Sequence, residues 1–237
     1  MEKGICNVSV APLRAEPSHQ SEMVSQMLYG ETAQILDING SFSRVKMLFD
    51  QYEGWVDTKQ ISKISEQDFV NRKACIVDET YRVYDLPKGR TLLSLGSEIL
   101  SDRELSDKNL TRQSIVETAR LFLNVPYLWS GRSFFGIDCS GFSQLVYKIH
   151  GITLPREAHQ QAEKGNVLDF LEESQPGDLA FFENEEGKIS HVGIMLEDQQ
   201  IIHAYGKVRI DVLDSSGIFN QELNTHTHKL RFVKSLL

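Results

Sequence analysis

The sequence has few of the features that mark membrane-spanning, secreted or nucleic-acid-binding proteins. No apolar run reaches the ~18 residues that a membrane-spanning helix needs. Basic residues are in the minority, with 25 Lys and Arg against 33 Asp and Glu for a net charge of −8, and no basic stripe is visible. We therefore expect no membrane span and no electrostatic binding of nucleic acid or of an anionic membrane.

Cysteine is also scarce. The three cysteines, Cys6, Cys75 and Cys139, are too few for a secreted disulfide scaffold and lack the CxxC spacing of a structural zinc site. Residues 1–10 lack the apolar stretch and cleavage site of a secretory signal. If Met1 is the native start, these absences predict a cytoplasmic protein with at least one free thiol.

The residues that are present divide the chain into an all-β first part and a mixed second part. Residues 1–65 contain short strand-like runs separated by turn signals, among them Asn39-Gly40, a strong hairpin signal. This pattern predicts a small antiparallel barrel. Residues 66–108 continue in short strands around a turn at Pro87, and they are either a partial second barrel or an extension of the first.

Residues 109–237 change from helical patterns to strand patterns. Ser114 with Glu117 forms a capping-box pattern at the start of one helix, although Thr111 competes as the cap. A second helix begins at Cys139 and carries an apolar stripe at i, i+3, i+4 and i+7 spacing. Strand-like runs fill most of the remainder, so we expect an α+β domain here.

Cys139 is the candidate nucleophile. It stands where a loop enters the second helix, so its thiol faces the positive end of the helix dipole, which we expect to lower its pKa. The free backbone N–H groups of the same turn are expected to bind an oxyanion. Cys6 and Cys75 lie in apolar, strand-like runs, which indicates inert residues.

Two histidines supply a candidate base. His191 and His203 lie 12 positions apart in consecutive strand-like runs, and a hairpin that pairs Leu196 with Gln200 places both imidazoles on one face, diagonal to each other. This geometry suits a base and the group that orients it. Two alternatives stay open, namely ordinary strand histidines and a zinc site formed with Cys139. The remaining histidines have no identifiable partner and are expected to be solvated or structural: His19, His150, His159, His226 and His228.

Six motifs in the second part carry a resemblance to a known family. In order along the chain they are Pro126-Tyr127-Leu128-Trp129-Ser130-Gly131, Asp138-Cys139-Ser140-Gly141-Phe142, Leu154-Pro155-Arg156, Pro176-Gly177-Asp178-Leu179, His191-Val192-Gly193-Ile194 and Ile202-His203-Ala204. Their order and spacing resemble the signatures of the NlpC-type peptidases across nearly all of residues 110–235. Glu53-Gly54-Trp55-Val56 resembles the end of the bacterial SH3-type barrels that precede such domains. Ser130 and Glu157 depart from the family pattern, which often has Gly and Asp there, and neither departure removes a catalytic group.

The resemblance implies an all-β SH3-like barrel followed by an α+β papain-like (NlpC-type) domain, with Cys139 as nucleophile, His191 as base and His203 as its orienting partner. It implies no cofactor and no metal. The subgroup with SH3-type barrels hydrolyses γ-D-glutamyl-L-diamino-acid bonds in murein stem peptides such as L-Ala-γ-D-Glu-diamino acid, which suggests cell-wall recycling. Two other functions remain open: a Cys-dependent acyltransferase or amidase acting on another amide, and a catalytically degenerate cell-wall-binding module.

The same resemblance assigns six side chains to the substrate. They are Asp138, Ser140, Tyr52, Tyr127, Trp129 and Arg156. Asp138 and Ser140 flank the nucleophile and are expected to help bind the free amino group of the substrate's L-alanine. Tyr52 matches a barrel residue that reaches into the cleft, and the other three match residues along it. From the residues alone, Asp138 is also a candidate helix N-cap and Tyr52 a candidate barrel-core residue.

Overall fold

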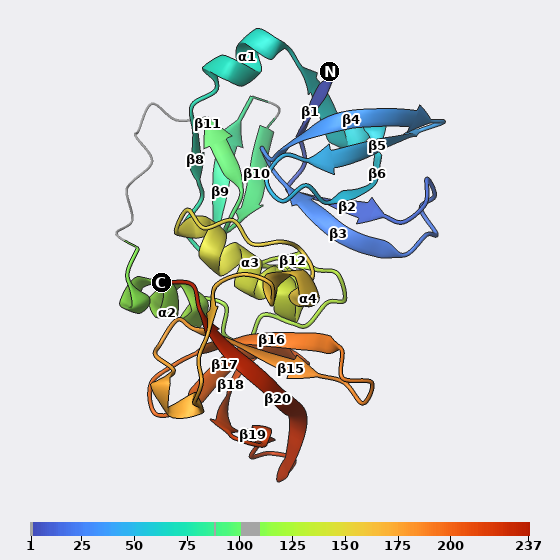
Figure 1. Cartoon of the computed structure of the whole chain (residues 1–237). Helices are drawn as coiled ribbons and strands as arrows, with labels where there is room; N and C mark the ends of the chain where they lie inside the picture. Colours follow the sequence, from blue (N-terminus) through green and yellow to red (C-terminus); the bar gives the residue numbers. More distant parts are fainter. Residues whose placement is uncertain (1, 88, 101–109) are drawn as a thin grey trace. The chain divides into compact units, whose positions relative to one another are not determined.

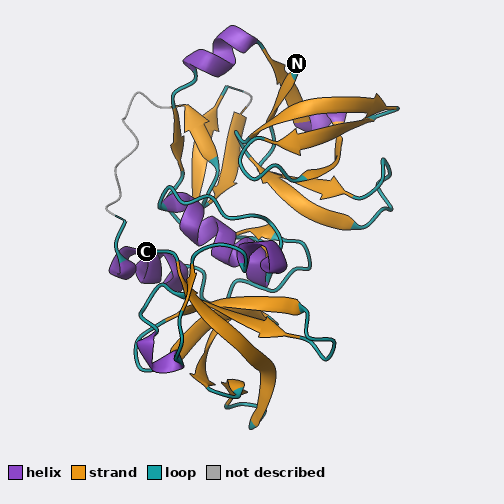
Figure 2. Cartoon of the chain, in the orientation of Figure 1, coloured by secondary structure: helices purple, strands orange, loops and turns teal. Residues whose placement is uncertain are grey.

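The structure is a computed structural model that describes residues 2–87, 89–100 and 110–237. The chain forms two compact units, whose elements are labelled in Figure 1 and coloured by type in Figure 2. The N-terminal unit comprises Met1–Asp107 with Trp129–Gly136, and the C-terminal unit comprises Lys108–Leu128 with Ile137–Leu237. Among the described residues, no helix has both the length and the apolar character needed to cross a bilayer.

The N-terminal unit contains a seven-stranded antiparallel sheet with the strand order β3-β2-β6-β5-β4-β1-β7. Its strands are β1 (Lys3–Cys6), β2 (Val10–Arg14), β3 (Met23–Leu28), β4 (Thr32–Asn39), β5 (Phe42–Met47), β6 (Glu53–Asp57) and β7 (Ile61–Ile64). The predicted hairpin turn joins β4 to β5, where Gly40 has a φ of 59°, a left-handed conformation that glycine adopts without strain. The sheet encloses an apolar core that includes Leu13, Met27 and Val45. The expected SH3-like, β-rich first part is therefore confirmed.

Residues 66–100 add a short helix and two two-stranded sheets to the same unit. After η1 (Thr58–Gln60), the elements are α1 (Glu66–Asn71), β8 (Ala74–Ile76), β9 (Tyr81–Leu86), β10 (Gly89–Ser94) and β11 (Glu98–Leu100), with β9 paired to β10 and β8 to β11. The Arg72 guanidinium ties this part to the turn between β3 and β4 by a hydrogen bond to the Gly30 carbonyl at 2.6 Å, and it also binds the Glu98 carboxylate of β11 at 2.8 Å. Residues 66–100 thus belong to the same compact unit as the sheet. The predicted boundary at 65/66 stays a prediction, and the one at 108/109 lies outside the described residues.

A segment from later in the sequence completes the N-terminal unit. Trp129–Gly136 contains β12 (Arg132–Ser133), which pairs with β13 (Gly136–Ile137). Arg132 donates two 2.7 Å hydrogen bonds to the carboxylate of Glu31, and both side chains are only 1% exposed. The Arg132 backbone N–H also donates to the Gln26 side-chain oxygen at 2.7 Å. The chain just before the candidate nucleophile is therefore anchored in the N-terminal unit by a buried ion pair.

Helices begin the C-terminal unit. They are α2 (Arg112–Arg120), α3 (Cys139–Ile149) and α4 (Ala158–Gln161), with the short turn η2 (Leu171–Glu173) further on. Thr111 caps α2 and forms its capping box with Ser114, so the predicted box of Ser114 with Glu117 is wrong. The reason is that the Thr111 hydroxyl accepts the Ser114 N–H at 3.1 Å, which starts the helix earlier than predicted. The second helix begins at Cys139, as predicted, and all of its residues are buried.

The strands of the C-terminal unit close into a six-stranded antiparallel barrel (Figure 1). They are β15 (Leu179–Glu183), β16 (Ile189–Met195), β17 (Gln200–Tyr205), β18 (Lys207–Asp214), β19 (Gly217–Asn220) and β20 (Thr225–Ser235), and β14 (Asn166–Val167) pairs with β20 outside the ring. Closure arises because β20 pairs with both β15 and β19. Helices packed on an antiparallel barrel confirm the expected α+β papain-like second part.

Candidate active site

The candidate nucleophile is the first residue of α3. Asp138 is the N-cap of this helix, because its Oδ1 accepts the Gly141 backbone N–H at 2.7 Å. Cys139 follows at the first helical position and is 8% exposed. The helix packs against β16 and β17 of the barrel, which holds the thiol beside the strands that carry the two histidines.

The thiol of Cys139 is less acidic than the sequence predicts. Burial raises its pKa to about 12, and the negative charge of Asp138 adds to the rise. Hydrogen bonds from the Val192 and Ser140 backbone and the charge of Arg156 act in the opposite direction without reversing it. The expected lowering by the helix dipole is therefore wrong for the free protein, because desolvation outweighs it. The thiol stays neutral until a base removes its proton.

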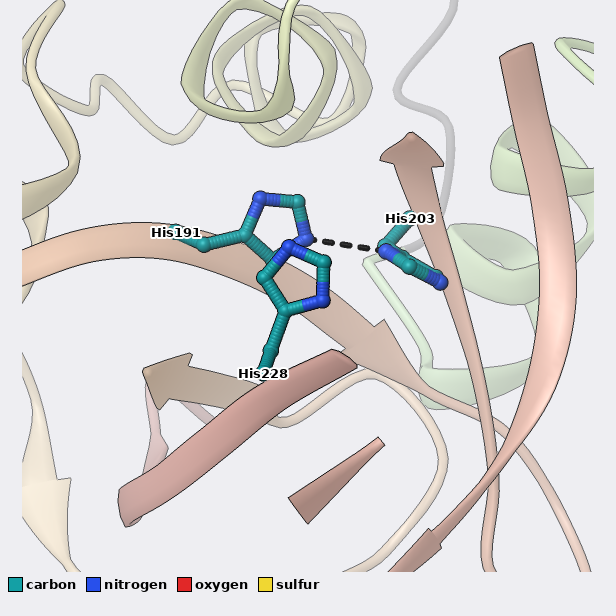
Figure 3. A group of neighbouring side chains, drawn as sticks. All are labelled: His191, His203 and His228. Atoms are coloured by element: carbon teal, nitrogen blue, oxygen red, sulfur yellow. Dashed lines mark hydrogen bonds between the residues drawn. The ribbon is translucent and has the colours of Figure 1, made fainter. Parts of the chain in front are cut away.

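The two predicted histidines lie together on one face of the barrel. β16 and β17 pair with Gly193 opposite His203, the register that the predicted hairpin requires. His191 Nε2 and His203 Nδ1 are 2.8 Å apart (Figure 3). Gly193 makes room for this contact, since a Cβ placed on it lies 2.7 Å from Ile201 Cδ1 and 3.0 Å from the His203 Cβ. The predicted meeting of the two imidazoles is seen in the structure.

Asp211 extends this pair into a chain of hydrogen bonds. His203 Nε2 lies 3.0 Å from Asp211 Oδ2, and Arg209 binds both oxygens of the same carboxylate, from Nε at 2.7 Å and from Nη2 at 2.9 Å. Burial acts to raise the pKa of Asp211, but the hydrogen bonds from His203 and Arg209 outweigh it and hold the pKa below its ordinary value. Asp211 was not predicted from the sequence. A signal was available, because Arg209 and Asp211 stand two positions apart in the strand that follows His203 and therefore lie on the same face of it.

The ionised carboxylate determines where the protons of both imidazoles lie. Asp211 can only accept, so His203 Nε2 carries a hydrogen and Nδ1 is left as an acceptor. His191 Nε2 must then donate to His203 Nδ1, which leaves a lone pair on His191 Nδ1. Burial, followed by the neighbouring His203 and His228, lowers the pKa of His191 well below 6.5, so the imidazole is neutral at pH 7. A neutral imidazole with a free lone pair is a competent base for a thiol.

Three of the predicted substrate-binding side chains form a cluster at the start of α3. Arg156 donates to both oxygens of Asp138, at 3.1 Å from Nη1 and 2.5 Å from Nη2, and to the Ser140 hydroxyl at 2.9 Å. The Arg156 side chain is 1% exposed. The carboxylate beside the thiol therefore has an internal positive partner, which the sequence argument did not include.

The three predicted aromatic contacts differ in their surroundings. Tyr127 is half-buried, and burial, followed by the charges of Cys139 and Asp138, raises the pKa of its hydroxyl to about 12. Trp129 is 65% exposed and donates from its indole nitrogen to Glu22 at 3.0 Å, within the N-terminal unit. Tyr52 packs against the core of the N-terminal sheet. Substrate contact by Trp129 and Tyr52 stays a prediction.

Sequence reasoning also missed His228, which was expected to be solvated or structural. The residue lies on β20, and its ring stacks on His191 with centroids 4.1 Å apart and planes 24° apart (Figure 3). No local signal in the sequence reports this contact, because it arises when β20 closes the barrel.

A buried cysteine at a helix start, with a His–His–Asp chain on the antiparallel sheet behind it, is the arrangement of a papain-like cysteine peptidase. Comparison with known families agrees with this class. Residues 124–227 match the NlpC/P60 family, and residues 13–61 match the bacterial dipeptidyl-peptidase Sh3 domain. The chain therefore carries an NlpC/P60 domain behind a bacterial SH3-type domain, and it is a cysteine-type peptidase.

Individual relatives cover different shares of the chain. The protein is 28% identical over 231 residues to the "Gamma-D-glutamyl-L-lysine dipeptidyl-peptidase" of Bacillus cereus, which covers 79% of this chain and 68% of that protein. A protein of the same name from Bacillus subtilis is 41% identical over 102 residues, which is 42% of this chain and 34% of the relative. The crystal structure of an NlpC/P60 family protein from Bacillus cereus shares the fold over 99% of both chains, with a TM-score of 0.83 at 22% identity.

Proposed function

We propose that the protein hydrolyses the γ-D-glutamyl-L-diamino-acid bond of free murein stem peptides, L-Ala-γ-D-Glu-diamino acid, and so takes part in cell-wall recycling. The names of the Bacillus cereus and Bacillus subtilis relatives support this substrate class. The observation that carries the proposal is the Asp138–Ser140–Arg156 cluster, which brings a carboxylate next to the nucleophile. The cytoplasmic location expected from the sequence remains a prediction.

The reaction uses the hydrogen-bond chain of the barrel. His191 Nδ1 takes the proton of the Cys139 thiol, and the sulfur attacks the γ-carbonyl carbon of D-glutamate. Backbone N–H groups at the start of α3 stabilise the resulting oxyanion. His191 then gives its proton to the leaving amine of the diamino acid. Water hydrolyses the thioester and releases L-Ala-γ-D-Glu, which restores the thiol.

Asp138 gives the site a means of recognising a free amino terminus. Its Oδ2 accepts from Arg156 Nη2 at 2.5 Å, and a carboxylate oxygen has a second acceptor position for the ammonium of L-alanine. A charge-assisted hydrogen bond of this kind contributes ~1.5–3 kcal/mol. Because Arg156 already compensates Asp138, an acylated nitrogen loses this bond without leaving the carboxylate unpaired.

N-acetylation of the alanine should therefore lower kcat/KM by about 10- to 150-fold, the equivalent of ~1.5–3 kcal/mol. The assay incubates the protein with L-Ala-γ-D-Glu-L-Lys or its diaminopimelate counterpart, acetylated or free, and measures the released dipeptide by mass spectrometry. Cys139→Ala is the control for contaminating activity. Equal cleavage of acetylated and free peptide would refute recognition of the amino terminus, and absence of the dipeptide would refute the substrate class.

A further inference from the structure

His228, which neither the peptidase mechanism nor the substrate cluster uses, forms a group of three imidazoles with His191 and His203. One ring nitrogen of each of His191, His203 and His228 lies within 4.8 Å of the corresponding nitrogens of the other two (Figure 3). His228 stacks on His191 and meets His203 edge-on, with centroids 5.7 Å apart and planes 84° apart. Three imidazoles are a frequent ligand set for Zn²⁺ and similar ions.

In two of these rings one nitrogen is already hydrogen-bonded to another residue, so the other nitrogen is the one available to an ion. His203 Nε2 is bound to the Asp211 carboxylate at 3.0 Å, a carboxylate–histidine arrangement that orients metal-ligating imidazoles. His228 Nδ1 is bound to the Thr227 hydroxyl at 2.9 Å, which leaves Nε2 as its available nitrogen.

A polar cavity gives an ion a route to His228. The cavity has a volume of about 780 Å³, and His228 forms part of its lining. The carboxylates of Glu183, Glu185 and Glu186 also line it. Glu183 is paired with Lys229 and Arg231, and Glu186 with Lys188, so the cavity offers access to an ion without a strong field of either sign.

We propose that His191, His203 and His228 bind a divalent ion of the Zn²⁺ class, and that the bound ion switches the peptidase off. The inhibitory part of this inference rests on the proposed function, whereas the binding part does not. This site differs from a zinc site formed by His191 and His203 with Cys139, because its third ligand is His228 and not the thiol.

Inhibition follows from the position of one proton. In the hydrogen-bond chain, His191 carries its proton on Nε2 and keeps a lone pair on Nδ1 for the thiol. An ion on Nε2 requires a lone pair there, so the proton of the neutral ring moves to Nδ1. His191 then has no acceptor for the Cys139 proton, and the nucleophile stays protonated.

The same step breaks the bond that orients the base. Two nitrogens on one tetrahedral ion, each ~2.05 Å from it, lie about 3.3 Å apart. His191 Nε2 and His203 Nδ1 are 2.8 Å apart, so the pair must open by about half an ångström when the ion enters. Loading the metal and forming the His191–His203 hydrogen bond are therefore mutually exclusive states.

Binding is tested first in a protein that cannot turn over substrate. Cys139→Ala is titrated with Co²⁺ and followed by its visible absorption, and Zn²⁺ affinity is obtained by competition. In this background, His228→Phe keeps an aromatic ring in the stack but removes the ligand, and it should weaken affinity at least about 100-fold. His226→Gln, two positions away on β20, is the matched control and should change affinity less than about threefold. His228→Gln serves as a second variant, with circular dichroism to verify folding.

Two results would overturn the proposal. Absence of Co²⁺ binding in Cys139→Ala would show that the three imidazoles do not hold the ion by themselves, and equal affinity in the His228 variants would show that it is held elsewhere. Inhibition is then measured on the active protein, where Zn²⁺ should block peptide cleavage, a chelator should restore it, and His228→Phe should raise the inhibitory concentration. Activation by Zn²⁺ would refute the inhibitory role. Because the Co²⁺ titration involves no peptide, failure of the proposed substrate leaves the metal result intact.

Discussion

The direction of the hydrogen bonds through His203 and His191 depends on one carboxylate, which makes Asp211→Asn the most informative substitution. In the native site, both Asp211 oxygens accept, one from His203 and Arg209 Nε together and the other from Arg209 Nη2. An asparagine has the same shape but replaces one oxygen with an NH₂ group, which only donates. Neither orientation of the amide satisfies all three donors.

The cost of the change follows from these two orientations. With the NH₂ group toward His203, Nε2 must accept, the chain reverses, and His191 Nδ1 carries a hydrogen and no lone pair. With the oxygen toward His203, the NH₂ group faces the Arg209 donor. In both cases the positive charge that forms on His191 during the reaction loses the compensating negative charge at the end of the hydrogen-bond chain, a loss of ~1.5–3 kcal/mol. We expect kcat/KM to fall by about 10- to 150-fold, mostly through kcat, because the charge exists only once the reaction has begun.

Steady-state kinetics on L-Ala-γ-D-Glu-L-Lys provide the measurement, with circular dichroism to verify folding. Glu222→Gln is the matched control, since Glu222 binds the opposite side of Arg209 at 2.9 Å and its side chain is 72% exposed. That variant should stay within about twofold of the native kcat/KM, as expected for an exposed pair. An Asp211→Asn protein with native kcat, or with a change in KM alone, would refute the conclusion that the Asp211 carboxylate keeps His191 competent as a base.

Three further predictions follow from the same structure. As pH falls, kcat/KM should drop only below the ordinary imidazole value of 6.5, because the pKa of His191 is lowered, and an acid limb above pH 7 would contradict this. His203→Gln, which keeps an acceptor for the His191 N–H, should lose about tenfold in kcat/KM against about 100-fold for His203→Ala, and equal losses in steady-state assays would argue against an orienting role. Glu31→Gln leaves Arg132 without its buried anionic partner and should lower the free energy of unfolding by ~3–5 kcal/mol in denaturant titrations, whereas Glu66→Gln, at an exposed pair, should leave the unfolding midpoint nearly unchanged.

The parts of the site that could be predicted from the sequence are those set by local rules. An even separation across a hairpin places His191 and His203 on one face, and the structure shows them 2.8 Å apart. Asp138 and Cys139 stand at a helix start that is recognisable from the apolar stripe behind it. These features depend on neighbouring turns and strands, whose geometry is set by short stretches of chain.

The parts that could not be predicted depend on contacts between distant segments. His228 reaches His191 because β20 pairs with β15 and β19, and both pairings contain a register shift that no local pattern reports. The acidity of the Cys139 thiol was misjudged for a related reason, since the burial that raises its pKa comes from packing of the whole unit. The internal pairing of Asp138 with Arg156 joins residues 18 positions apart, on either side of α3 and the loop that follows it.

The anchoring of Trp129–Gly136 in the N-terminal unit also constrains the order in which the protein can be assembled during translation. Domains are generally completed from the N-terminus as the chain is synthesised. Here Glu31 stays without its guanidinium partner until Arg132, 101 residues later, has left the ribosome. The first unit therefore cannot reach its final state as an independent early product. A ribosome that stalls before residue 132 holds a nascent chain with an uncompensated carboxylate in its interior, whereas one that has passed residue 136 holds every part of the first unit and is about to add the nucleophile.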